Sequence, residues 1–368
     1  MLTNRVLRNL DCTLIGAAVL LLAVSLIMIG SATHVNTMAE DRYWFLQRQG
    51  LFALLNIIIL IASLNWDYQQ LGRLAKGLYF INLALLVAVM LVGHSALGAQ
   101  RWIQIGPISL QPSEFSKLIM IISLAKILEE RKDKLQTWSD LVPVFAYVGV
   151  PFLLVMKQPD LGTSLVFLAI LFGMLYVAGI GQKLLMSIFG AGIVAMPIFW
   201  HFLKDYQKKR LTVFIDPGAD PLGSGYHIIQ SKIAIGSGML TGKGLFEGTQ
   251  SQLKFLPENH TDFIFAVIGE ELGFIGCVFV LAVFFVLIYR GLQIALSARD
   301  DFGCLLAAGI VSMWAFHVLV NVGMTAGIMP VTGIPLPFIS YGVSSLTTNM
   351  LSVALLLNIY VRRQKLFF

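Results

Sequence analysis

The stretch LPENHTDFIFAVIGEELG, Leu256 to Gly273, joins a polar segment to a long apolar run. Its acidic residue Asp262 stands directly before the apolar run that starts at Phe263. A charge placed inside a bilayer costs roughly 2.5–3.5 kcal/mol even on lenient insertion scales. An acid at the mouth of an apolar helix therefore needs either a structural or a chemical reason.

The composition of the whole chain indicates that lipid is its solvent. The 368 residues are 57% hydrophobic and 12% charged, with a mean hydropathy of +0.80, whereas soluble proteins carry roughly 25% charge. The formal net charge is +6, but the basic residues lie between apolar runs. We therefore expect membrane lipids as partners of these residues, and no nucleic acid.

The apolar runs predict an all-α polytopic membrane protein with about ten transmembrane helices, because about 20 apolar residues span a bilayer. Residues 1–368 then form a single transmembrane domain, with a large loop at residues 205–262 between the seventh and eighth helices. The predicted spans are residues 12–33, 48–64, 75–93, 113–130, 140–157, 161–179, 183–204, 263–290, 303–327 and 339–361.

The basic residues are distributed unequally between the two sides of these spans. One set of segments holds Arg5, Arg8, Arg73, Lys76, Lys126, Arg131, Lys132, Lys134, Lys183, Arg290, Arg299, Arg362, Arg363 and Lys365. The short loops of the opposite set hold Arg42, Arg48, Arg101 and Lys157. The positive-inside rule then predicts that both termini are cytoplasmic and that residues 205–262 are extracytoplasmic.

Polar clusters gather at the predicted outer side. In GAQRWIQIGPISLQPSEFSKL, residues 98–118, Glu114 and Lys117 are three apart, so they share one helix face and can form an ion pair. Arg101 precedes them in a loop. The simpler interpretation is an acidic first turn beside the helix dipole and a lysine that reaches toward the headgroups.

Three other outer segments offer candidate groups. Asp160 stands where an N-cap belongs, and the same geometry suits a carboxylate in a polar cavity. The GKG stretch around Lys243 can approach phosphate through backbone N–H groups, although no P-loop pattern is present. The uncharged, proline-broken residues 329–345, which include Ser340, favour a pocket wall, because irregular backbone at membrane depth is tolerated only inside protein or beside water.

Asp262 itself has two interpretations. It can be an acid at a helix N-terminus with Thr261 as the cap, or a general base that is ionised at neutral pH. We expect the helix dipole and solvation to lower its pKa. Glu258 and His260 are nearby rivals for the same role.

Five ordered motifs resemble the SEDS family of bacterial cell-wall membrane proteins. They are QRWIQIG, QPSEFSK, QPDLGTS, FLPENHTDFIFAVIGEELG and PLPFISYG, and together they extend the resemblance over essentially the whole chain. The short amino terminus, GAQRWI and QSQLKFLPENHTDFIFA are more similar to the elongation branch of the family than to the division branch. One departure is Val343, where the family usually has glycine, and this puts the local turn in doubt.

The resemblance implies a peptidoglycan glycosyltransferase of the bacterial cytoplasmic membrane, with its active site on the outer face. Such an enzyme polymerises lipid II into a lipid-linked glycan chain, releases undecaprenyl pyrophosphate, and works with a class B penicillin-binding protein. The family's catalytic acid matches Asp262. Other polar positions of the family match Arg101, Trp102, Glu114, Lys117 and Asp160.

This chemistry needs one base and a source of positive charge. Asp262 can take the proton of the acceptor hydroxyl, and the departing pyrophosphate requires cations. Arg101, Lys117, Arg210 or a divalent cation, Mg²⁺ or Mn²⁺, can supply them; the sequence itself specifies no cofactor. The candidate substrate-binding residues are Arg101, Trp102, Gln111, Glu114, Lys117, Asp160, Arg210, Lys243, His260 and Ser340.

Two alternatives belong to other classes of protein. A lipid II flippase also has many spans and intramembrane charges, but the polar motifs here gather at one face and show no inverted repeat. A non-catalytic scaffold would tolerate the loss of Asp262.

Overall fold

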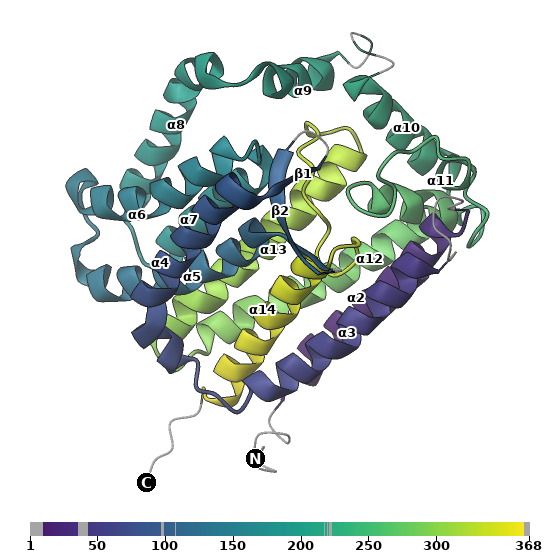
Figure 1. Cartoon of the computed structure of the whole chain (residues 1–368). Helices are drawn as coiled ribbons and strands as arrows, with labels where there is room; N and C mark the ends of the chain where they lie inside the picture. Colours follow the sequence, from purple (N-terminus) through teal and green to yellow (C-terminus); the bar gives the residue numbers. More distant parts are fainter. Residues whose placement is uncertain are drawn as a thin grey trace.

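The computed structural model describes residues 10–35, 43–96, 99–106, 108–216, 218, 220 and 223–363. Within these ranges the chain is a bundle of helices with one small antiparallel sheet of three strands (Figure 1). The strands are β1 (His94–Ala96), β2 (Ala99–Ile105) and β3 (Ile108–Leu110). Arg5, Arg8, Arg42 and Lys365 of the topology argument lie outside the described residues.

Each of the ten predicted spans coincides with a helix. The helices are α2 (Cys12–Thr33), α3 (Trp44–Ser63), α4 (Gln69–Val92), α5 (Pro112–Arg131), α6 (Trp138–Lys157), α7 (Leu161–Val177), α8 (Gln182–Phe202), α12 (Ile264–Leu296), α13 (Asp301–Thr325) and α14 (Val343–Val361). The all-α membrane fold is therefore confirmed. Seven of these helices are long and apolar enough to cross a membrane; α7 and the apolar part of α8 are shorter, and α5 carries six charged residues, so the count of ten spans is not confirmed.

Helix α13 lies at the centre of the bundle and packs against α12, α7, α5 and α14 (Figure 1). Small residues allow this close packing, because they let helix backbones approach one another. A Cβ atom at Gly173 of α7 would stand 1.9 Å from Oγ of Ser312, and one at Gly309 of α13 would stand 2.6 Å from Cγ2 of Ile121. The central helix is therefore held on two sides by contacts that leave no room for a methyl group.

Helix α12 is broken at Gly273, whose φ of 64° and ψ of −162° are not helical. The preceding loop pairs with the break: Phe274 N donates to Met239 O at 2.9 Å, and Lys243 N donates to Glu270 O at 3.0 Å. Residues 264–272 and 274–296 are thus two helical segments, whereas the sequence predicted one continuous span at 263–290. Glycine makes the break possible because it adopts positive φ at no steric cost.

Two acids stand beside the break. Glu271 Oε1 accepts from Ser31 Oγ near the end of α2 at 2.5 Å, and Glu270 Oε1 pairs with Lys243 Nζ at 2.8 Å. Both acids lie at the end of the short helical segment 264–272, directly before the break. They fix α11 (Thr249–Gln252) and the loop before it to the break, because Gln250 N and Ser251 N donate to Glu270 and Phe246 N donates to Glu271.

The predicted large loop is partly helical. It contains α9 (Asp205–Ile215), α10 (Ser224–Ser237) and α11. In Figure 1, α8, α9 and α10 follow the edge of the bundle opposite the start of α2 and the end of α14. The segments predicted to be extracytoplasmic therefore lie together at one end of the bundle.

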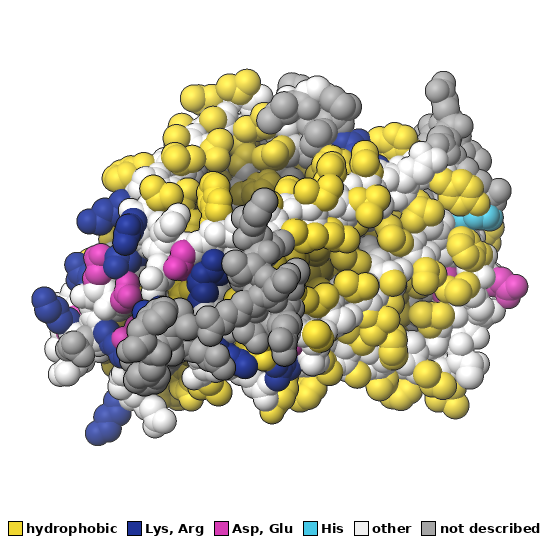
Figure 2. Space-filling model, turned by 90° about the horizontal axis from the view of Figure 1, so that it is seen from below, with side chains coloured by type: hydrophobic (Ala, Val, Ile, Leu, Met, Phe, Trp, Pro, Cys, Tyr) yellow, Lys and Arg dark blue, Asp and Glu magenta, His cyan; other side chains and the backbone are white. Residues whose placement is uncertain are grey.

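The opposite end carries the basic segments. Arg290 pairs with Asp11 at the start of α2, and Lys132 Nζ lies 2.6 Å from Asp301 Oδ1. Figure 2, seen from below the view of Figure 1, shows Lys and Arg side chains gathered with acids on the left and hydrophobic side chains over much of the rest. The structure thus separates the two sets of segments that the charge bias distinguished.

Gly273→Ala should destabilise the protein by about 2 kcal/mol or more, because a Cβ atom there would stand 2.3 Å from Gly242 N in a backbone conformation unfavourable to L-residues. Thermal unfolding in detergent measures the change. The control is Gly16→Ala in α2, where a Cβ meets nothing within 4 Å; it should change stability by no more than about 1 kcal/mol. Equal melting temperatures for the two variants would contradict the role of the break.

Candidate active site

A pocket of about 250 Å³ opens at the end of the bundle that holds α9. Its walls come from β2, the starts of α5 and α7, α9, the segment before α12 and the loop before α14. The lining residues are Arg101, Trp102, Gln111, Glu114, Asp160, Thr163, Arg210, Glu258, Thr261, Asp262, Thr332, Gly333, Pro335, Tyr341, Gly342, Ser344 and Ser345. Segments far apart in the sequence thus converge on one polar cavity.

The backbone of residues 260–262 is held by three hydrogen bonds. Tyr341 N donates to His260 O at 2.9 Å, Ser340 Oγ donates to Thr261 O at 2.6 Å, and Asn321 Nδ2 donates to Asp262 O at 2.9 Å. Three successive carbonyls are therefore fixed by α13 and the loop before α14. The side chain of Asp262 is left to face the pocket.

The Asp262 carboxylate has an unusual environment. No donor within the described part of the chain hydrogen-bonds it, and a Cβ atom at Gly333 would stand 3.2 Å from its Oδ2. The pKa of this carboxyl is raised to about 6: burial is the largest cause, Glu258 and Asp160 act in the same direction, and Arg210 and Arg101 oppose them. The side chain keeps partial access to the pocket.

This result corrects the expectation that the helix dipole and solvation lower the pKa of Asp262. Helix α12 begins one residue later than assumed: its N-cap is Phe263, which makes no side-chain cap hydrogen bond. The Thr261 hydroxyl donates to Glu258 Oε2 at 3.1 Å and caps nothing. Enclosure by protein therefore has a larger effect on Asp262 than the helix terminus.

Two guanidinium groups supply positive charge to the pocket. Arg101 donates to the carbonyls of Gln158 and Pro159 and lies 3.7 Å from Asp160 Oδ1. Arg210, on α9, donates to Thr332 O at 3.2 Å. The two arginines are close enough that each disfavours the charge of the other, and burial with this repulsion lowers the pKa of Arg210.

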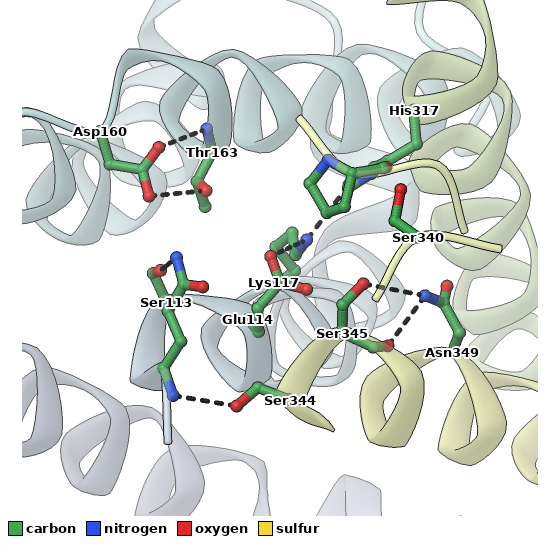
Figure 3. Close-up of polar contacts among 12 residues, drawn as sticks. Ser113, Glu114, Lys117, Asp160, Thr163, His317, Ser340, Ser344, Ser345 and Asn349 are labelled. Carbon is green, nitrogen blue, oxygen red and sulfur yellow. Dashed lines mark hydrogen bonds and ion pairs between the residues drawn. The ribbon is translucent and has the colours of Figure 1, made fainter. Parts of the chain in front are cut away.

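Asp160 satisfies both interpretations made from the sequence. It is the N-cap of α7, where its Oδ1 accepts from Thr163 N at 3.1 Å and its Oδ2 from Thr163 Oγ1 at 3.0 Å (Figure 3). It also lines the pocket. Its carboxylate thus accepts two hydrogen bonds, whereas the Asp262 carboxylate accepts none from the described residues.

Glu114, Lys117 and His317 form a buried chain between α5 and α13 (Figure 3). Lys117 Nζ donates to Glu114 Oε1 at 2.7 Å and lies 3.1 Å from His317 Nε2, while His317 Nδ1 lies 3.0 Å from Pro335 O. The ammonium has only donors, so Nε2 accepts and Nδ1–H donates to the Pro335 carbonyl. The predicted Glu114–Lys117 pair exists, and it is connected to the pocket wall.

Four predicted substrate-binding residues do not line the pocket. Lys117 lies beneath it in the chain just described, and Lys243 pairs with Glu270 at the break of α12. His260 packs against the rings of Phe45 and Tyr341. The Ser340 hydroxyl is already engaged, because it donates to Thr261 O and accepts from Leu336 N. The contacts of these four residues stabilise the fold. The cavity itself is bordered by the remaining predicted residues, Arg101, Trp102, Gln111, Glu114, Asp160, Arg210 and Asp262.

Val343 does not disturb the turn as the sequence suggested. It is the first residue of α14, in a helical conformation, and it is absent from the positions with positive φ. Its carbonyl accepts from Thr347 Oγ1 at 2.8 Å. A β-branched residue is therefore compatible with this position.

Two residues near the site, His317 and Asn321, belong to none of the sequence motifs. Both are polar residues in the predicted span 303–327, and they stand four apart on one helix face. A polar side chain in a transmembrane segment is a functional candidate by default, so their place in this span is the sequence signal that identifies them.

A divalent cation was one sequence candidate for charge stabilisation. Within the ranges that the structure describes, no group of three or more His, Cys, Asp or Glu side chains is arranged to hold a metal ion. The positive charges that the protein itself supplies to the pocket are those of Arg101 and Arg210.

The fold and the site define a multi-pass membrane protein with one polar pocket at an end of its helical bundle. The family model for FtsW, RodA and SpoVE, described as "Cell cycle protein", matches residues 12–365. The chain belongs to this family, the SEDS family to which its motifs pointed.

Known relatives cover almost the whole chain. Stage V sporulation protein E of Bacillus subtilis (strain 168) is 42% identical over 357 residues, 95% of this chain and 96% of the relative. Peptidoglycan glycosyltransferase MrdB of Escherichia coli (strain K12) is 41% identical over 367 residues, 97% of this chain and 95% of the relative.

Solved structures share the fold. A chain from work on "structural coordination of polymerization and crosslinking by a peptidoglycan synthase complex" matches with a TM-score of 0.82 and 30% identity, over 97% of this chain and 99% of that one. The rod shape determining protein RodA of Thermus thermophilus matches with a TM-score of 0.72 and 28% identity, over 97% and 98% of the two chains.

Asp262→Asn should raise the melting temperature by a few degrees at about pH 7.5, with no difference below about pH 4. The pKa of about 6 in the folded state exceeds the ordinary value of 3.8. Ionisation of Asp262 therefore lowers the free energy of unfolding as the pH rises from about 4 to about 6, and the asparagine variant avoids this loss. Asp205→Asn, at an exposed aspartate of α9, should bring no such gain. Identical melting curves for wild type and Asp262→Asn at both pH values would contradict the buried, unpartnered carboxylate.

Lys117→Met should cost about 3–5 kcal/mol, because it leaves the buried Glu114 carboxylate without its cation. The double variant Glu114→Gln/Lys117→Met should recover most of this loss. Chemical denaturation of the wild type, both single variants and the double variant in detergent measures the coupling. Strictly additive effects would show that the two groups act independently.

Proposed function

We propose that the chain is a peptidoglycan glycosyltransferase that polymerises lipid II, with Asp262 as the general base. The relatives named as glycosyltransferases support the reaction class. The observation that carries the residue assignment is the Asp262 carboxylate: it faces the pocket, accepts no hydrogen bond from the described residues, and has its pKa raised to about 6. A base with a pKa near the working pH combines an available lone pair with useful basicity.

The proposed step is a single displacement. Asp262 accepts the proton of an acceptor sugar hydroxyl while the hydroxyl oxygen forms a bond to the anomeric carbon of the donor. The bond from that carbon to the pyrophosphate oxygen breaks, and its electron pair leaves with undecaprenyl pyrophosphate. Configuration at the anomeric carbon is inverted. The leaving group requires no proton, so one carboxylate is sufficient.

Arg101 and Arg210 are placed to stabilise the charge that develops on the leaving group. Both border the same pocket as Asp262, and they come from different segments, β2 and α9. Their backbone hydrogen bonds fix the guanidinium groups before substrate arrives, so that little reorganisation is needed during the reaction. In this proposal Glu114 and Asp160, which border the same pocket, also contact the substrate.

We further propose that the pocket end faces the outside of the cytoplasmic membrane and that both termini are cytoplasmic. The basic segments gathered at the other end support this orientation through the positive-inside rule. Residues 205–262 then form the extracytoplasmic loop of a single transmembrane domain. A class B penicillin-binding protein is the proposed partner, supported by the synthase complex in which the similar fold occurs. The motif resemblance favours a role in cell elongation.

Asp262→Asn should lower the polymerisation rate by about 10²-fold or more, because a positioned base typically contributes 10²–10⁴-fold. The wild-type rate should rise with pH, reach half of its maximum near the Asp262 pKa of about 6, and level off at higher pH. Purified protein with lipid II, with and without the partner and a chelator, and with separation of the glycan chains, provides the measurement.

The matched control is Asp301→Asn, which removes an exposed aspartate at the opposite end of the bundle. It should retain the wild-type rate. A folded Asp262→Asn protein that polymerises lipid II at the wild-type rate would refute the base assignment. Movement of lipid II from one leaflet of a vesicle membrane to the other, without formation of glycan chains, would instead identify a flippase.

A further inference from the structure

One buried amide joins the two walls of the pocket that meet at Asp262. Asn321 of α13 is fully buried, and its Nδ2 donates to Asp262 O at 2.9 Å and to Ile334 O at 2.8 Å. These carbonyls belong to the segment before α12 and to the loop before α14. A single side chain therefore sets the distance between the segment that carries the carboxylate and the loop behind it.

The choice of side chain fits this task. An amide nitrogen has two N–H groups, and here both find a backbone carbonyl. The Oδ1 atom of Asn321, by contrast, is buried and has no partner among the described residues. A buried acceptor without a donor is unfavourable, so the two donor contacts are what this residue contributes.

The loop behind Asp262 has a second attachment to the same helix. His317, one turn earlier on α13, donates to Pro335 O at 3.0 Å. Two consecutive carbonyls, those of Ile334 and Pro335, are thus tied to α13. Gly333, directly before them, has φ of 73° and packs against the carboxylate, where a Cβ atom would stand 3.2 Å from Asp262 Oδ2.

We propose that Asn321 is a positioning residue for the reaction: its two hydrogen bonds fix the Asp262 backbone against the Gly333 loop and so set where the carboxylate meets the acceptor hydroxyl. The proposal rests on the assignment of Asp262 as the base. Asn321 does not line the pocket, so it acts through Asp262 and not on the substrate. A displacement of about 1 Å in a reacting group can reduce a rate about 10²-fold.

The charges around Asp262 determine how its pKa would change if its backbone were no longer fixed. Glu258 on its own segment and Asp160 at the start of α7 disfavour the ionised carboxylate, and Arg210 on α9 and Arg101 on β2 favour it. Burial is the largest contribution. A carboxylate released from the Gly333 loop should gain solvent, and the acidic midpoint of the rate should then move down from about 6 toward the ordinary aspartate range.

The test compares Asn321→Leu with Asn358→Leu. Asn358 of α14 is a matched control: it is buried, and its Nδ2 also donates to two backbone carbonyls, those of Ser63 and Trp66, at 3.0 and 2.6 Å. It lies at the opposite end of the bundle. Both variants lose two donor contacts to backbone carbonyls, and Asn358→Leu also loses two acceptor contacts, from Tyr68 N and Arg362 Nη1 to Oδ1. Both variants should therefore be less stable, and Asn358→Leu at least as much as Asn321→Leu.

Only Asn321→Leu should lower kcat for lipid II polymerisation, by about tenfold or more per folded molecule with KM within about twofold, and move the acidic midpoint downward. Equal kcat and an unchanged midpoint for the two folded variants would overturn the proposal. If Asn321→Leu does not fold, Asn321→Ser tests the proposal instead. One hydroxyl can donate to only one of the two carbonyls, so the proposal requires a kcat below that of the wild type and a lowered acidic midpoint of the rate.

A readout without activity separates this proposal from the assignment of the base. Two proteins that differ only by Asp or Asn at position 262 differ in melting temperature, and the pH dependence of this difference reports the Asp262 pKa. In the Asn321→Leu background that difference should shrink if Asn321 holds the carboxylate in place. Shrinkage together with full activity of Asp262→Asn would refute the base and retain the positioning. An unchanged difference with inactive Asp262→Asn would refute the positioning alone.

Discussion

The structure depends on how carboxylates are held where water is scarce. Glu270 accepts four hydrogen bonds or ion-pair contacts, Asp160 caps a helix, and Glu114 pairs with a lysine. Each of these charges is compensated in the way that buried charges require. Asp262 differs from them: its backbone carbonyl is held by Asn321, while its carboxylate accepts no hydrogen bond from any residue that the structure describes. The fold thus holds this acid in place without neutralising it, which is what a general base needs.

The break at Gly273 explains how this acid reaches the pocket. If α12 were continuous, the residues before it would leave the bundle along the axis of the long segment. The break lets residues 264–272 take a different course from the membrane-spanning segment, and the buried acids Glu270 and Glu271 hold the neighbouring loop against it. The hydrogen-bonded acids at the break and the pocket-facing Asp262 therefore lie at opposite ends of one short helix.

Much of the fold could be predicted from the sequence because apolar length is a strong and local signal. All ten predicted spans are helices, and the polar motifs expected on one side do meet at one end. The break in α12 was missed because Gly273 in an apolar run reads as an ordinary helix residue until its tertiary contacts are known. The pKa of Asp262 was predicted in the wrong direction for a related reason, since enclosure depends on segments distant in sequence. Lys243 and Ser340 looked available in the sequence, but their hydrogen-bonding groups are used within the fold.

The attachment of residues 260–262 through three backbone carbonyls has a practical consequence. None of these anchoring hydrogen bonds passes through the side chain at position 262, so the course of the backbone around the cavity does not depend on which residue stands there. Under the role proposed for Asp262, a single exchange at this position therefore gives an inactive protein whose backbone at the pocket is unchanged. Under the proposed function, such a protein would be suited to trapping bound substrates for direct observation.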